Sequence, residues 1–366
     1  MTSLGRPGMI RLIVTATASL MAVASLACAG PAAASRADNI PPPVVDTAQL
    51  PPIVLSARVL DMASEYRAYM RRTAALTAHF QNGDAIEKSL AQAETYEPQQ
   101  LVRGAVAYAA VIALQDPAFV AGVRVYAANR GVRKDFADRI IADPYYITGM
   151  PGAGTAANMI MTALHNHGQK MSELGGKIRL AAYDVQREQP WSKSFVTDRN
   201  GRLAAAKALS AAPMTPVPEE VASLAEAVSG STKFVETELP SGAATEAAPA
   251  PYSQFVARSL ALAALAALGE GGEENDAALD TLLNDSSAGF CLNMSKLNLY
   301  QCLAVAKPWY EDMFCLGLHA MADTGQCIAK AAGEPTLAMQ QPATGVTSTG
   351  APSASVALHG KPPGER

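Results

Sequence analysis

The sequence predicts an all-α fold of roughly ten helices, in an orthogonal or solenoid-like array with a disulfide-bonded C-terminal helical hairpin. Three observations predict it. The 366 residues include 72 alanines, the residue with the highest helix propensity. Apolar residues recur at helical spacing, and no segment alternates as a strand does. An apolar content of 49% with ordinary glycine and proline content excludes disordered and fibrous classes.

The first 34 residues have the pattern of a secretory signal peptide. Arg6 and Arg11 precede an apolar run over 12–26, and Ala32-Ala33-Ala34 provides the small residues of a cleavage site. The run is shorter than the roughly 20 residues that span a bilayer. We therefore expect export, with a periplasmic or secreted mature chain, although an uncleaved membrane anchor is an alternative.

A second alternative is a lipid anchor on Cys28 after lipoprotein processing. Ser25 argues against it, because a lipobox has an aliphatic residue three places before its cysteine. No segment of the mature chain is expected to span a membrane. The apolar runs over 101–114 and 255–268 are too short, each carries one arginine, and both indicate buried core helices.

Composition divides the mature chain into five regions. A proline-rich extended segment (35–53) precedes a helical domain (54–235), a linker or long loop (236–251), a C-terminal helical region (252–334) and a disordered tail (335–366). The spacing of apolar residues and the helix-terminal signals predict helices over 55–80, 84–95, 98–115, 117–129, 134–142, 157–185, 203–211, 218–228, 253–268, 276–283, 293–306 and 310–322. Asp84 is expected to be the N-cap of the second of these helices.

The segment 157–185 has the most regular pattern in the chain. Its apolar positions alternate in steps of three and four residues, as in a heptad seam, and His167 occupies one of them. Gly168, Gly175 and Gly176 lie off this seam, and each costs about 1 kcal/mol relative to alanine. The pattern predicts either one long helix or a break at Gly175-Gly176.

Four cysteines lie close together near the C-terminus, and an even number in an exported chain predicts disulfides. Residues 11 apart in one helix are separated by about 16 Å. A disulfide tolerates at most about 7 Å between Cα atoms, which excludes bonds within one helix. Two antiparallel helices around Pro308 predict nested bonds, Cys302–Cys315 inside Cys291–Cys327. The interval of 12 residues in the second arm matches the hairpin less well, and we expect Cys327 to lie just beyond a helix ended by Gly325.

This layout resembles the nested-disulfide helical hairpin of twin Cys-x9-Cys proteins. The spacings here are x10 and x11, the likeness covers a small part of the chain, and it implies no function. The alternative to disulfides is a metal site, since Cys315, His319 and Asp323 recur at i, i+4 and i+8 on one helical face. In an oxidising compartment we favour the disulfides, with no metal and with His319 paired to Asp323.

The sequence contains no catalytic motif and no cofactor-binding loop. We therefore expect no cofactor and a non-enzymatic binding or scaffolding protein of the cell envelope. A formal charge of −4 argues against nucleic acid, so the expected partner is a protein or another envelope component. The alternative is a periplasmic hydrolase acting on cell-wall material, with a carboxylate beside His167 as its catalytic candidate.

Overall fold

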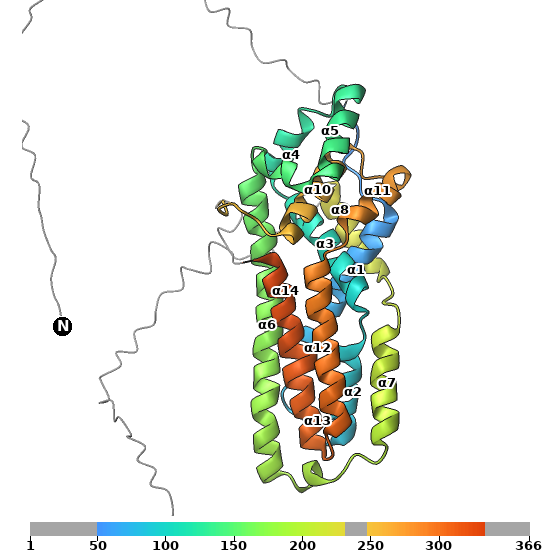
Figure 1. Cartoon of the computed structure of the whole chain (residues 1–366), viewed down its shortest axis with the longest axis vertical. Helices are drawn as coiled ribbons and strands as arrows, with labels where there is room; N and C mark the ends of the chain where they lie inside the picture. The colour runs from blue at the N-terminus through green and yellow to red at the C-terminus, as the bar shows by residue number, and fades with distance from the viewer. Residues whose placement is uncertain (1–49, 231–246, 334–366) are drawn as a thin grey trace, which may run out of the picture. The chain divides into compact units, whose positions relative to one another are not determined.

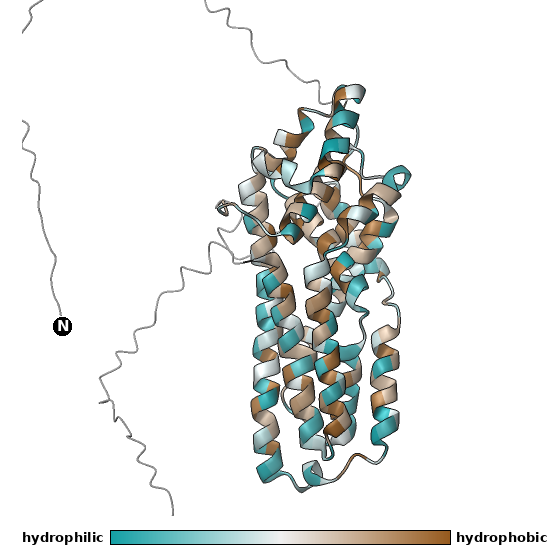
Figure 2. Ribbon diagram, viewed as in Figure 1, coloured by the Kyte–Doolittle hydropathy of each residue, from teal (hydrophilic) through white to brown (hydrophobic). Residues whose placement is uncertain are grey.

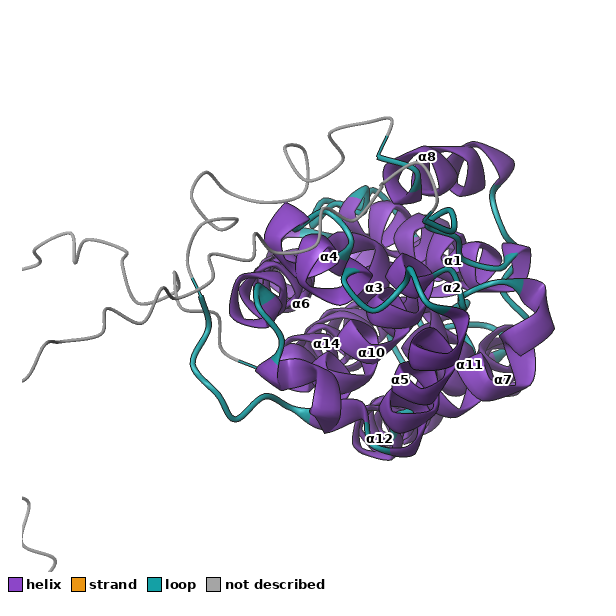
Figure 3. Ribbon diagram, turned by 90° about the horizontal axis from the view of Figure 1, so that it is seen from above, coloured by secondary structure: helices purple, strands orange, loops and turns teal. Residues whose placement is uncertain are grey.

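The computed structural model of the protein describes residues 50–230 and 247–333. These residues are 77% helical and form 13 α-helices without a β-strand, which confirms the predicted all-α class (Figure 3). The predicted signal peptide, Cys28 and the predicted tail lie outside the described residues, as does most of the predicted linker.

Figure 1 shows the arrangement of the helices. In chain order they are α1 (Ala57–Ala74), α2 (Gly83–Glu94), α3 (Pro98–Ala113), α4 (Pro117–Arg124), α5 (Arg130–Ala142), α6 (Ala153–Glu188), α7 (Arg199–Ala211), α8 (Pro218–Val228), α10 (Gln254–Leu268), α11 (Asp276–Leu282), α12 (Ser286–Val305), α13 (Trp309–Cys315) and α14 (Thr324–Ala332). Short 3₁₀ turns occur at η2 (Pro144–Gly149), η3 (Pro190–Lys193) and η4 (Glu273–Asn275), and a π-helical segment, η5 (Leu316–Asp323), joins α13 to α14.

The core is built around α3 and α10, which contact each other and are buried over most of their circumference. Helices that are apolar all round belong inside a fold, whereas the longer helices alternate apolar and polar residues (Figure 2). The one arginine of each core helix reaches a partner at the edge. Arg103 donates to Asn284 at 3.0 Å, and Arg258 donates to the carbonyl of Thr281 at 2.5 Å. Among the described helices, none alone has the length and hydropathy of a membrane span, and α3 with α4 reaches them only as a pair bent by 89°.

Helix α6 is a single helix of 36 residues, without a break at Gly175-Gly176. Its backbone lies against η5 and α14 (Figure 1). A Cβ atom on Gly168 would lie 2.3 Å from the carbonyl oxygen of Gly325, and one on Gly175 would lie 2.4 Å from that of Gly317. The glycines therefore remove the side chains that would hold the two backbones apart, which accounts for their presence inside a helix.

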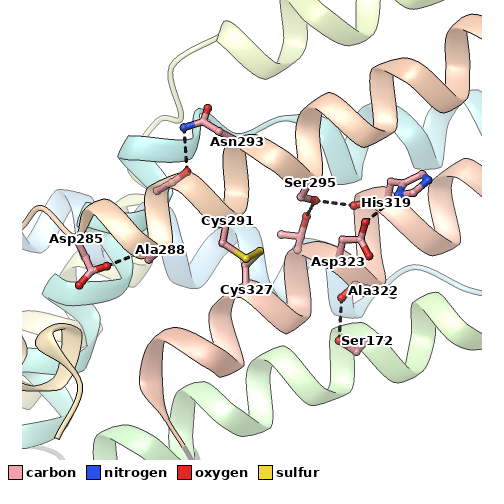
Figure 4. The surroundings of a disulfide bond; sticks show 12 residues. Ser172, Asp285, Ala288, Cys291, Asn293, Ser295, His319, Ala322, Asp323 and Cys327 are labelled. Carbon is pink, nitrogen blue, oxygen red and sulfur yellow. Dashed lines mark hydrogen bonds and ion pairs between the residues drawn. A yellow bond between two sulfur atoms is a disulfide. The ribbon is translucent and has the colours of Figure 1, made fainter.

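The second arm of the C-terminal hairpin is continuous from α13 through η5 to α14, and two disulfides join it to α12. Cys302 bonds Cys315 with Cα atoms 5.7 Å apart, and Cys291 bonds Cys327 with Cα atoms 5.6 Å apart (Figure 4). The structure therefore confirms the predicted disulfide-bonded hairpin. It corrects one detail: the helix does not end at Gly325, so Cys327 lies inside α14.

The π-helical segment explains the unequal cysteine intervals. The two cysteines of α12 are 11 residues apart, those of the second arm are 12 apart, and η5 lies between the latter pair. A π-helical segment holds more residues per turn than an α-helix, so it absorbs one extra residue without moving the cysteines off the shared face. The same extra residue is seen at the contact with α6. Gly317 and Gly325 are eight residues apart, whereas the glycines that they face, Gly175 and Gly168, are seven apart.

Several helix boundaries differ from the sequence expectation for local reasons. Helix α2 is capped by Asn82, whose side chain accepts from the Ala85 amide, so Asp84 lies within the first turn and is not the cap. The first helix ends at Ala74 rather than at residue 80. The predicted helix 117–129 ends at Arg124, and Asn129 instead caps an α5 that begins four residues earlier than predicted.

We predict opposite effects for two adjacent glycine substitutions in α6. Gly175→Ala should destabilise the protein by about 1–3 kcal/mol, because its Cβ meets the backbone of η5. Gly176→Ala is the matched control: no atom lies within 4 Å of its Cβ position, so alanine should stabilise by up to about 1 kcal/mol through helix propensity. Urea unfolding of both variants measures the difference, and equal shifts would contradict close backbone packing.

Removing the inner disulfide should also lower stability. Replacing both Cys302 and Cys315 with serine opens a loop of 13 residues, for which chain entropy predicts a loss of about 3 kcal/mol. Thermal unfolding under oxidising conditions measures the loss. The parent protein treated with reductant is the control, because it should lose at least as much. An unchanged midpoint in the double variant would show that this bond constrains nothing.

Candidate functional sites

His167, the catalytic candidate from the sequence, lies on α6 where this helix passes α1. Its Nδ1 is 3.1 Å from the hydroxyl of Tyr66, and its ring lies 5.6 Å from the ring of Tyr108. The side chain lines a hollow of about 150 Å³ between α1 and α6. His167 is thus held by aromatic neighbours and partly open to solvent, rather than enclosed in the core.

The charged residues around His167 are mainly cationic. Arg67 and Arg71 come from α1 and Lys170 from α6, and none of the residues lining the hollow is acidic. The nearby carboxylate is Glu220 of α8, which is buried and paired with both arginines, at 2.7 Å from Nη1 of Arg67. The hollow therefore does not place a free carboxylate beside His167, as the sequence-based hydrolase hypothesis requires.

The alternative metal site at Cys315, His319 and Asp323 lacks a free thiolate. The Sγ atom of Cys315 is bonded to Cys302, so it is unavailable as a metal ligand. His319 and Asp323 lie side by side with Nδ1 and Oδ2 2.8 Å apart, as expected for a histidine paired to an acidic residue one turn away (Figure 4). Among the described residues, no group of three or more potential ligands gathers as a metal site requires.

A buried polar cluster, not foreseen from the sequence, surrounds Lys296 of α12. The side chain is only 4% exposed, and its ammonium donates to the carbonyl of Glu94 and to the hydroxyl of Ser210, the latter at 2.9 Å. It also lies 3.5 Å from the ring centroid of Tyr96, whose hydroxyl is 3.0 Å from that of Thr324. The cluster connects α2, α7, α12 and α14.

Burial shifts the pKa values of this cluster towards the neutral forms. Desolvation raises the pKa of Glu94 from 4.5 to about 7, while the charge of Lys296 opposes the shift. Desolvation likewise lowers the pKa of Lys296 from 10.5 to about 7. Such values occur at catalytic sites, but also in structural networks. Because both side chains are buried, the cluster connects helices and presents no reactive group to solvent.

A second buried pair lies beside the cluster. Arg202 of α7 contacts both carboxylate oxygens of Asp312 on α13, at 2.5 Å, and also donates to the carbonyl of Leu303. Burial raises the pKa of Asp312 to about 6, against the attraction of Arg202. A buried pair of this kind is sensitive to substitution, since removing one partner leaves the other charge desolvated.

The outward face of α12 is unlike that of an ordinary surface helix. Lys296 is the one charged residue of α12, and it points inward. The exposed positions carry no charge at all: they are Ser286, Ser287, Phe290, Asn293, Met294, Leu297, Gln301, Ala304 and Val305. Phe290 is 68% exposed and Val305 is 72% exposed. We call the line of Phe290, Met294, Leu297 and Val305 the α12 stripe; steps of four, three and eight residues place it on one side of the helix.

The α12 stripe leads into an apolar hollow at the C-terminal end of the helix. Val305 belongs to both, and the hollow of about 250 Å³ is also lined by Tyr183 of α6 and by Tyr310 and Phe314 of α13. Both cysteines of the inner disulfide form part of its wall. The stripe and the hollow form an exposed apolar surface that is interrupted by the exposed Gln301 between Leu297 and Val305. Exposed apolar surfaces of this kind are typical of protein interaction sites.

Comparison with protein-family models, with curated proteins and with solved structures found no match for this chain.

The Glu94 pKa predicts a pH-dependent effect of Glu94→Gln. Between pH 4.5 and 7 the folded protein holds a proton that the unfolded chain has released, so the contribution of Glu94 to stability falls as pH rises through this window. Glutamine cannot lose that proton. The variant should therefore match the parent near pH 5 and be more stable at pH 8, in urea unfolding at both values. A difference that is the same at both pH values would contradict the raised pKa.

Proposed function

We propose that this chain is an exported, non-enzymatic binding protein that docks a helix of another cell-envelope protein along the α12 stripe. The observation that carries the proposal is the absence of charge from the outward face of α12, combined with the burial of its one lysine. A helix facing only water gains nothing from exposing phenylalanine, methionine, leucine and valine in one line.

The geometry of the stripe favours a helix as the partner. From Phe290 to Val305 it is about 22 Å long at 1.5 Å per residue. Its first steps, of four and three residues, resemble the seam of a coiled coil, and Gln301 occupies the next seam position before Val305. The helices flanking α12 are α7 and α14 (Figure 1). A partner helix with apolar residues at three- and four-residue steps would extend the bundle, and one bulky side chain could enter the hollow beside Val305.

The cell-envelope location rests on two supports. The N-terminal leader pattern predicts export, and two disulfides are consistent with an oxidising compartment. A hydrolase centred on His167 stays a prediction and takes second place, because the neighbouring carboxylate, Glu220, is paired with two arginines.

Site-specific photocrosslinking tests the docking surface. A benzophenone amino acid at Phe290, introduced in cells that make the protein, should crosslink a peptide of another envelope protein with apolar residues at three- and four-residue steps. Leu297→Lys should abolish this adduct, because it places a charge in the middle of the stripe. The substitution should change the unfolding free energy by no more than about 0.5 kcal/mol, since the position is exposed.

Val132 on α5 provides the matched control. It is exposed to nearly the same extent as Leu297, so a photoreactive residue there should not form the adduct, and Val132→Lys should not prevent it at Phe290. An adduct that survives Leu297→Lys, or crosslinks only to lipid or to the chain itself, would overturn the proposed function.

A further inference from the structure

We propose that the hollow between α1 and α6 binds a small organic phosphate, through the side chains of Arg71 and Lys170. This hollow is the one of about 150 Å³ beside His167, and it lies apart from the α12 stripe in the residues that form it. The proposal is independent of the docking function.

The first argument is charge. Three cationic side chains, Arg67, Arg71 and Lys170, line the hollow, and Glu220 is the carboxylate that pairs with the two arginines. This leaves an excess of positive charge in a partly enclosed space. Lys170 makes no ion pair within the described residues. A phosphate monoester carries between one and two negative charges at neutral pH, which matches the excess better than a single carboxylate does.

The second argument is the supply of donors. Arg71 is 65% exposed and contacts Glu220 through Nη1. A guanidinium has five N–H donors, so Arg71 can contact Glu220 and still donate to a bound oxyanion. Lys170 adds an ammonium from the facing helix. Arg67 is more buried and also donates to Ser223 at 3.3 Å, so it supports Glu220 rather than the ligand.

The third argument is the apolar floor of the hollow, which indicates the chemistry of the part of the ligand that is not phosphate. Met70 and Met171 form this floor and are buried, while Ala74 lines the hollow at an exposed position. An inorganic ion would leave this apolar surface uncovered. The volume is below the 300 Å³ or so at which sites for drug-sized ligands begin. The floor and the volume together favour a phosphate on a compact apolar body.

Methyl NMR of full-chain protein labelled at the methionine methyl groups tests this site, with phenyl phosphate as the probe. The methyl signals of Met70 and Met171 should shift and saturate, while phenol should cause no saturable shift. Lys170→Met should weaken phenyl phosphate binding by about tenfold or more. Lys170→Arg, which keeps the positive charge, should bind phenyl phosphate about as tightly as the parent protein. Lys134→Met, which removes an exposed lysine from α5, should leave it unchanged.

Four results would overturn the site. They are the absence of a shift at Met70 and Met171, equal affinity in the Lys170→Met variant, equal binding of phenol, and shifts spread evenly over all methionines. A lipid headgroup presents the same phosphate chemistry, so vesicles of phosphatidylcholine with phosphatidic acid form a second arm. Binding to these vesicles without a response to soluble phenyl phosphate would also overturn the assignment to a small molecule.

Discussion

The close contact between the backbone of α6 and the second arm of the hairpin is the constraint on which the rest of the fold depends. Gly168 and Gly175 on one side, with Gly317 and Gly325 on the other, let the two rods approach nearer than any side chain would allow. The contact runs along α6, which continues without a break through a pair of adjacent glycines. It also places η5 beside α6, so that the π-helical segment and the disulfides are held between two long helices.

Much of the secondary structure could be predicted from local chemistry. Pro218 in the first turn and Gly230 after the last turn predicted both ends of α8 correctly. The two apolar runs that each contain one arginine correspond to the core helices α3 and α10. The nested disulfides followed from helix rise and cysteine spacing alone. Errors arose where a neighbouring residue competed for the same role, as when Asn82 rather than Asp84 capped α2.

The candidate sites were harder to predict, because they join residues distant in sequence. The seam identified His167, but Arg67, Arg71 and Glu220 come from other helices, and their charges decide the chemistry around it. The pairing of Lys296 with Glu94 and Tyr96 likewise needs three dimensions. The sequence did carry one usable signal: twenty residues from 286 to 305 contain a single charge, which is unusual for a helix with a face in water.

The two disulfides also have a consequence for α12 itself. Covalent bonds near both ends of the helix, at Cys291 and Cys302, prevent it from rolling about its own axis or sliding along its neighbour. The two bonds therefore remove this torsional freedom from the folded protein, and the rotational entropy of the helix is already lost before any association. An association along such a preoriented edge keeps more of its contact free energy, and the gain would appear as a longer lifetime of the complex.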